Sequence, residues 1–224
     1  MEIRFMVRSL AAVAVSAAFA APALADTVQL NSWTFGGPSS VSVGTPNYSG
    51  GAGKFSGFLN SNAFETFCAE LTQTFNLGVT YNNYSVVNAV TAWGSARSTA
   101  LDKVLSFVAS APGTWLYSPD TSAAVQSAVW EVLNETGSSY DFTTGSFKAS
   151  SSGTTQTALT ALNNSLWGSL ATQAITVHAD KLFSEDHQDF LVITAVPEPE
   201  TYAMLLAGLG IVGAVGRRRR SASA

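Results

Sequence analysis

The chain is most regular at PDTSAAVQSAVWEVLNETG, residues 119–137, where the pattern is typical of an amphipathic helix. A helix is expected to follow Pro119 and Asp120, and Gly137 suits the position just past a helix end. The apolar side chains between them recur at helical spacing and form one stripe: Val125, Ala128, Val129, Val132 and Leu133. The sequence therefore predicts a helix here, with one face buried.

Two further helices are predicted, one on each side of this stretch. The first begins near residue 98, carries apolar residues at positions 101, 104, 105 and 108, and ends before Pro112. The second is a weaker pattern over 156–171, in which leucines recur at roughly helical spacing.

Shorter stretches nearer the ends of the chain are typical of strands. Apolar residues in 28–35 alternate with one slip, as in a strand that contains a β-bulge. Residues 36–57 are rich in Gly, Ser and Pro and indicate loops around short strands. A period of two then follows over 64–71 and again over 75–81, which we expect to form neighbouring strands.

The end of the body, over 175–177 and 190–196, also has the character of strands. The predicted fold class is therefore a mixed α+β domain, with β-strands at both ends and two or three helices in the middle. An N-terminal signal peptide and a short hydrophobic helix at the C-terminus are expected in addition.

Charge is scarce and unevenly placed. The 224 residues include 11 Lys and Arg, 15 Asp and Glu, and a single cysteine. Residues 26–195 hold five of the basic and 12 of the acidic residues, so this body has a net charge of −7. An acidic body argues against nucleic acid as a partner. One cysteine excludes an intramolecular disulfide framework and a multi-cysteine zinc site.

The N-terminus has the three parts of a secretory signal peptide. Arg4 and Arg8 are followed by the apolar run 10–21 and by small residues that end at Ala25. We therefore expect a signal peptide over 1–25 and an exported domain over 26–195.

The C-terminal segment, 196–224, has three ordered features. Pro197, Glu198 and Pro199 come first, and the apolar run 202–216 follows. The segment then carries four arginines, Arg217, Arg218, Arg219 and Arg220. A helix of this length spans about 22 Å, short of the roughly 30 Å hydrocarbon core of a bilayer, so it is a marginal anchor. The alternative is a permanent single-span tail anchor.

This C-terminal order resembles the PEP-CTERM sorting signal of Gram-negative bacteria. The resemblance implies recognition and processing by an exosortase, a membrane transpeptidase-like enzyme. It also implies an exported surface or matrix protein of a kind often found beside exopolysaccharide genes. This signal implies how the chain is exported and processed, but it does not imply an activity of the protein.

Cys68 and Gln126 are the sharpest candidate site in the body. Cys68 lies in FCAEL (67–71), and Gln126 lies in VQSAVW (125–130). The two segments resemble the thioester domain of bacterial surface adhesins, which carry a cysteine near the front and a Gln-x-Ala-(Ile/Val)-Trp segment later. Those adhesins usually have Thr directly before the Gln, where this chain has Val125.

The resemblance implies that the sulfur of Cys68 and the side-chain carbonyl carbon of Gln126 join with loss of ammonia. An amine or hydroxyl on a target surface would then capture the acyl group. On a helical wheel Gln126 falls at the edge of the apolar stripe, about 20° from Leu133. Cys68 shares a strand face with Thr66 and Glu70. The alternative is a core thiol and a helix-edge amide with no chemistry between them.

Other chemistry has weaker support. The sequence has no Gly-x-Ser-x-Gly, phosphate loop or His-Glu-x-x-His motif, and we predict no cofactor. His178 and His187 flank an acidic segment without regular ligand spacing, so we interpret it as a polar turn and predict no metal. Glu131 and Glu135 are four residues apart, and we expect them on a solvated helix face.

We therefore predict a non-enzymatic protein with a structural or interaction role in exopolysaccharide or biofilm. It would be exported across the inner membrane to the cell surface or medium, and anchored transiently by its C-terminal helix before processing. The expected partners are the secretion machinery, an exosortase, and exopolysaccharide or surface amines. The alternative functions are a covalent adhesin with a Cys68–Gln126 thioester and, with less support, an exported hydrolase.

Overall fold

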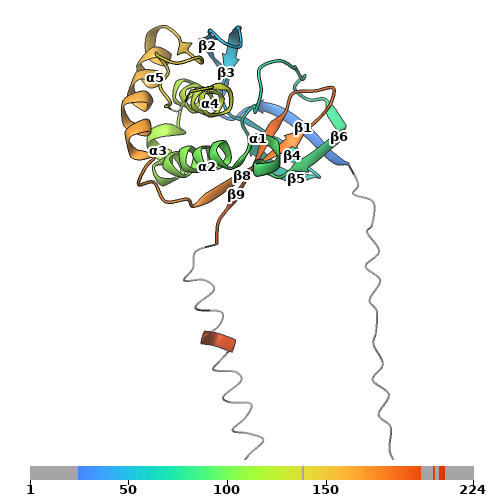
Figure 1. The fold of residues 1–224 in the computed structure, drawn as a ribbon. Helices are drawn as coiled ribbons and strands as arrows, with labels where there is room; N and C mark the ends of the chain where they lie inside the picture. Colours follow the sequence, from blue (N-terminus) through green and yellow to red (C-terminus); the bar gives the residue numbers. More distant parts are fainter. Residues whose placement is uncertain (1–24, 138, 198–203, 205–206, 210–224) are drawn as a thin grey trace, which may run out of the picture.

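The computed structural model describes residues 25–137, 139–197, 204 and 207–209 (Figure 1). The predicted signal peptide up to residue 24 lies outside the described residues. So does most of the sorting signal, including Glu198, Pro199 and the four arginines Arg217, Arg218, Arg219 and Arg220. No helix in the described parts of the chain is both long and apolar enough to span a membrane.

The described residues form a mixed α/β fold with nine strands in two antiparallel sheets, which confirms the predicted class. The larger sheet has the order β5-β4-β1-β6-β8-β9. Its strands are β1 (Asp26–Trp33), β4 (Phe55–Leu59), β5 (Asn62–Thr66), β6 (Thr80–Val87), β8 (Val177–Phe183) and β9 (Phe190–Ala195). The smaller sheet has the order β3-β2-β7, with β2 (Ser39–Val43), β3 (Tyr48–Ala52) and β7 (Ala149–Ser150).

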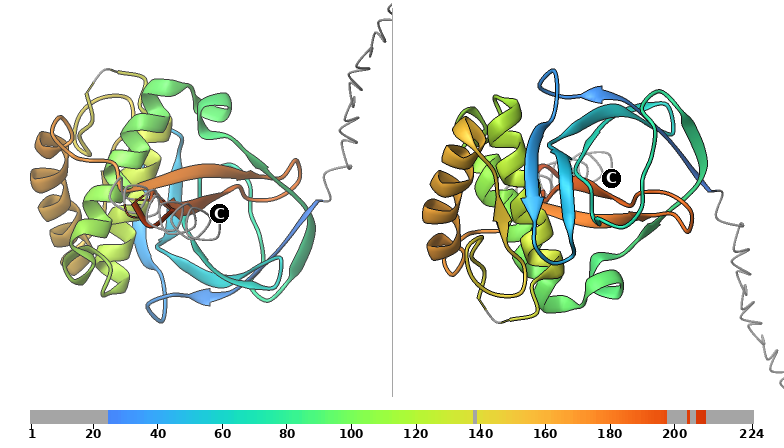
Figure 2. Two further views of the ribbon diagram at one scale, coloured as in Figure 1. Left: turned by 90° about the horizontal axis from the view of Figure 1, so that it is seen from below. Right: turned by 90° about the horizontal axis from the view of Figure 1, so that it is seen from above.

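In chain order the helices of the domain lie between β6 and β8, and the short strand β7 lies between α4 and α5. They are α1 (Ala89–Trp93), α2 (Ser95–Ser110), α3 (Pro112–Trp115), α4 (Pro119–Asn134), α5 (Gly153–Leu166) and the 3₁₀ turn η1 (Trp167–Ser169). The larger sheet and the helices lie side by side, with the β2–β3 hairpin packed against α4 (Figures 1 and 2).

The slip predicted in the first strand is confirmed. The pairing of β1 with β4 shifts register between Leu30 and Ser32. Gly57 of β4 lies opposite Leu30, and a Cβ atom there would approach the carbonyl oxygen of Gln29 to 2.0 Å. A glycine is therefore required where the two backbones come closest.

The larger sheet curls until its two edges meet. The hydroxyl of Thr66, at the end of β5, donates a 2.7 Å hydrogen bond to the carbonyl of Leu191 in β9. Two residues further on, Cys68 and Phe190 form an isolated antiparallel bridge. The segment after β5 thus closes the sheet, and Cys68 lies in this closure.

Helix α4 is the centre of the second half of the fold. Ser118 and Thr121 form a reciprocal capping box at its start, and Pro119 occupies the first turn. Every residue from 121 to 133 is buried, because α2, α5 and the smaller sheet surround the helix. Figure 1 shows α4 nearly end-on inside this ring. The predicted helix is correct, but the single buried face is wrong.

One strand prediction and one turn prediction are wrong in part. Residues 71–79 form a loop, and β6 begins only at Thr80, pairing with β1 and β8 rather than with β5. The apolar alternation there does not mark a buried face: the Phe75 ring packs 5.0 Å from both Phe55 and Phe190, whereas Leu77 and Val79 are each 42% exposed. The first half of the expected polar turn, around His178, is strand β8.

Candidate functional site

The structure brings Cys68 and Gln126 together from segments 58 residues apart. The backbone N–H of Cys68 donates to Oε1 of Gln126 at 2.8 Å. The side-chain Nε2 of Gln126 donates to the backbone carbonyl of Cys68, also at 2.8 Å. The carboxamide of Gln126 therefore lies flat against the backbone of Cys68 and is held at both ends.

The bridge to β9 explains why the backbone of Cys68 needs this partner. The residues on either side of Cys68 make the backbone hydrogen bonds to β9. The N–H of Ala69 donates to the Asp189 carbonyl at 2.8 Å, and the N–H of Leu191 donates to the Phe67 carbonyl at 3.1 Å. Cys68 is thus the non-hydrogen-bonded member of an antiparallel pair, and its own N–H and C=O face the other way. Gln126 occupies the place that another strand would take on that side.

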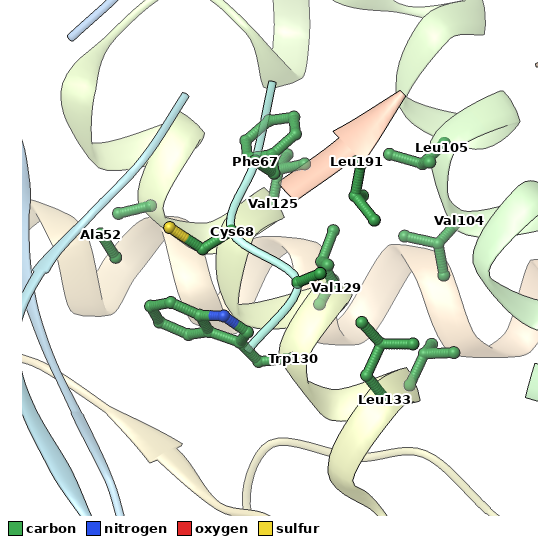
Figure 3. Close-up of a cluster of buried hydrophobic side chains, with 14 of the residues drawn as sticks. Ala52, Phe67, Cys68, Val104, Leu105, Val125, Val129, Trp130, Leu133 and Leu191 are labelled. Carbon is green, nitrogen blue, oxygen red and sulfur yellow. The ribbon is translucent and has the colours of Figure 1, made fainter. Parts of the chain in front are cut away.

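Both side chains are nearly closed off from solvent. Gln126 is 0% exposed and Cys68 is 7% exposed. Figure 3 shows Cys68 among the buried apolar side chains, with its sulfur pointing toward Ala52 rather than toward Val129. A cavity of about 390 Å³ opens onto the pair, and Cys68 and Gln126 both line it.

Five aromatic rings contribute to the walls of this cavity, which we call the aromatic cavity: Trp33, Tyr48, Phe55, Phe75 and Trp130. They come from β1, β3, β4, the 71–79 loop and α4. Polar groups are few at this site, and they include Glu70, Gln73 and Gln188. Apolar walls with a few placed polar groups are typical of small-molecule sites.

The site keeps the cysteine as a protonated thiol. Burial raises the pKa of Cys68 well above its ordinary value, and the nearby carboxylate of Glu70 raises it further. Burial also raises the pKa of Tyr48, with a smaller contribution from Cys68. Cys68 has no disulfide partner. The arrangement is a buried cysteine whose backbone is bonded to a fixed carboxamide, with both side chains sheltered from bulk water.

The two residues that the sequence singled out are in hydrogen-bond contact, but their surroundings were not predicted. Gln126 was expected at the edge of an apolar stripe, but α4 is buried all round. The roles of Thr66, Trp33 and Tyr48 had no signal in local spacing, because each depends on which strands become neighbours.

The two histidines lie away from the aromatic cavity. Nδ1 of His178 is 2.5 Å from Oδ2 of Asp102, and its side chain is 60% exposed. The ring of His187 packs at 4.3 Å from that of Tyr81. Within the described residues no cluster of three or more His, Cys, Asp or Glu side chains is arranged to hold a metal ion.

The expectation that Glu131 and Glu135 face solvent is wrong. Glu131 is 0% exposed, and burial raises its pKa to about 8. Glu135 is 3% exposed and accepts hydrogen bonds from the backbone N–H groups of Gly137, Ser146 and Phe147. These bonds lower its pKa to about 2. Both carboxyls organise the loop after α4, which covers the helix face that the pattern left polar.

The comparisons with known proteins agree with the C-terminal signal. A family model described as the PEP-CTERM protein-sorting motif matches residues 195–220. The chain thus carries the sorting motif of an exported protein that is anchored at the membrane and then processed by an exosortase. No curated protein and no solved structure matches the chain.

Proposed function

We propose that the exported domain is a non-enzymatic surface or matrix protein that attaches itself covalently through a Cys68–Gln126 thioester. The observation that supports this proposal is the pair of 2.8 Å hydrogen bonds that hold the carboxamide against Cys68. The carboxamide of Gln126 is thus held against the residue that carries the thiol, and both residues line the aromatic cavity.

The first step forms the thioester. Sγ of Cys68 attacks Cδ of Gln126, the Sγ–Cδ bond forms, and the Cδ–Nε2 bond breaks. The thiol proton leaves with the nitrogen as ammonia, so the step creates no net charge in a buried site. The N–H of Cys68 already donates to Oε1 of Gln126, and it stabilises the negative charge that develops on this oxygen.

The second step attaches a partner. A neutral amine attacks Cδ, an amide bond forms, the Cδ–Sγ bond breaks, and the proton released by the amine returns to Sγ. Shelter from bulk water protects the thioester until an amine enters the aromatic cavity. Export and processing by an exosortase would put this reactive bond at the cell surface, where polymers of a biofilm or exopolysaccharide are within reach.

Amine capture tests this function. The exported protein is incubated with methylamine, and the product is digested and analysed by mass spectrometry. We expect one methylamine per chain, on Gln126, with Cys68 becoming open to alkylation at the same rate. A Cys68→Ala variant is the matched control and should take up none. Equal labelling of parent and control, or no labelling of either, would contradict the proposal.

A further inference from the structure

The aromatic cavity carries one negative charge that no neighbouring cation balances. Glu70 is half-buried, and among the described residues that line the cavity it is the one Asp, Glu, Lys, Arg or His. The ion pairs of the described residues do not involve it. Its carboxylate accepts hydrogen bonds from two uncharged groups, the hydroxyl of Thr72 at 2.7 Å and the backbone N–H of Asp189 at 3.3 Å. The cavity can therefore attract a cation.

This carboxylate lies close to the thiol of Cys68. The two residues are two positions apart, which is about 7 Å along an extended chain. The negative charge of Glu70 raises the pKa of Cys68, so its field reaches the sulfur. The sulfur points toward Ala52, which also lines the cavity (Figure 3). A cation that Glu70 holds in the cavity is therefore near the atoms of the proposed thioester.

Charge distinguishes the two kinds of nucleophile that can open a thioester. A primary amine such as a lysine side chain has a pKa of about 10.4, so it is a cation at neutral pH. A carboxylate attracts this cation, and the faces of the aromatic rings that line the cavity attract it as well. An aliphatic hydroxyl is uncharged and gains neither attraction. The cavity therefore favours amines over hydroxyls.

We propose that Glu70 selects ammonium groups over hydroxyl groups as partners for the Cys68–Gln126 thioester, and accepts the proton that the ammonium loses before it attacks. This role rests on the proposed thioester. The ammonium gives one proton to the carboxylate of Glu70 and becomes a neutral amine. Charged groups are disfavoured in a cavity sheltered from water, which assists this transfer.

The remaining protons are accounted for in the attack itself. The neutral amine attacks Cδ of Gln126, the N–Cδ bond forms, and the Cδ–Sγ bond breaks. A second proton of the original ammonium passes to Sγ of Cys68, and the third stays on the nitrogen of the new amide. Glu70 then releases its proton to solvent and regains its negative charge, so it can act again only as a bystander to a finished bond.

The first experiment measures capture rates on the exported protein at pH 7 by mass spectrometry. Methylamine, which is protonated at this pH, is compared with hydroxylamine, which is mostly neutral. Glu70→Gln should lower the ratio of the methylamine rate to the hydroxylamine rate about tenfold. A variant that only disturbs the fold changes both rates together and leaves this ratio unchanged. An unchanged ratio, or faster capture of glycerol than of methylamine by the parent, would overturn the proposal.

Two further variants serve as controls. Glu70→Asp keeps the carboxylate, and its ratio should be closer to that of the parent than to that of Glu70→Gln. Glu185→Gln removes the same charge from an exposed side chain outside the cavity lining, and it should keep the ratio of the parent within about twofold. A tenfold fall in Glu185→Gln would assign the attraction to the net charge of the domain and overturn the assignment to Glu70.

The second experiment separates the role of Glu70 from the thioester. Treatment with hydroxylamine leaves Cys68 as a free thiol, whether or not the bond was present. This thiol is then modified with aminoethyl methanethiosulfonate, a cation, or with methyl methanethiosulfonate, which is neutral. Glu70→Gln should lower the ratio of the cationic to the neutral rate about tenfold. That result, in a parent that captures neither methylamine nor hydroxylamine, would overturn the thioester alone. An equal ratio in the parent and Glu70→Gln would overturn the role of Glu70.

Discussion

The two hydrogen bonds between the side chain of Gln126 and the backbone of Cys68 lead to a quantitative prediction about stability. Replacing Gln126 with methionine keeps a side chain of similar length and volume but removes both polar ends. The N–H and C=O of Cys68 are then buried without partners, because the ladder bonds to β9 belong to the neighbouring residues. An unmatched buried group costs about 1–3 kcal/mol, so the free energy of unfolding should fall by about 2–6 kcal/mol.

The assay is urea unfolding followed by tryptophan fluorescence. Both proteins carry Cys68→Ala, so that a thioester contributes nothing to the difference. Gln173→Met is the matched control, since Gln173 lies outside the cavity, and it should stay within about 0.5 kcal/mol of its parent. A fall of less than about 1 kcal/mol for Gln126→Met would refute the idea that Gln126 takes the place of a strand.

Three further predictions concern buried polar groups. The pKa of Glu131 is raised from 4.5 to about 8. The free energy of unfolding that Glu131 contributes is therefore present at low pH and is lost as the pH rises from 4.5 to 8. Glu131→Gln should remove this loss, as measured by urea unfolding at pH 5 and pH 8. The pKa of Glu135 is lowered from 4.5 to about 2, so the stability that it contributes is present above pH 4.5 and is lost as the pH falls toward 2. In Glu135→Gln the thermal midpoint should change less between pH 2 and pH 5 than in the parent. An equal change in both proteins would contradict this role of Glu135. Thr66→Val removes the hydroxyl that bonds Leu191 across the closure and should lower the free energy of unfolding by about 1–3 kcal/mol, whereas the exposed Thr72→Val should have little effect.

Local patterns in the sequence predicted the elements with strong periodicity. The helix at 119–134 and the bulge near Leu30 follow from spacing that neighbouring residues fix among themselves. The failures have a common cause. The apolar alternation at 75–81 and the polar positions Glu131 and Glu135 were assigned from period alone, and each is decided by contacts with residues outside the repeating segment.

The candidate site, too, was predicted only in part. The contact between Cys68 and Gln126 was expected from the resemblance to thioester domains, and the structure places the two residues in hydrogen-bond contact. The aromatic cavity was not predicted, because Trp33, Tyr48 and Trp130 converge only once β1, β3 and α4 have packed.

The most direct test of the thioester is the intact mass of the exported protein, purified without reducing agent or amine buffer. A Cys68→Ala variant purified in the same way is the reference. We expect the parent to be lighter than its sequence mass by one ammonia, and the variant to have its full sequence mass. Added methylamine should then leave the parent one methylene heavier than its sequence mass. A parent of full mass, with one cysteine that is alkylated after unfolding, would contradict the thioester.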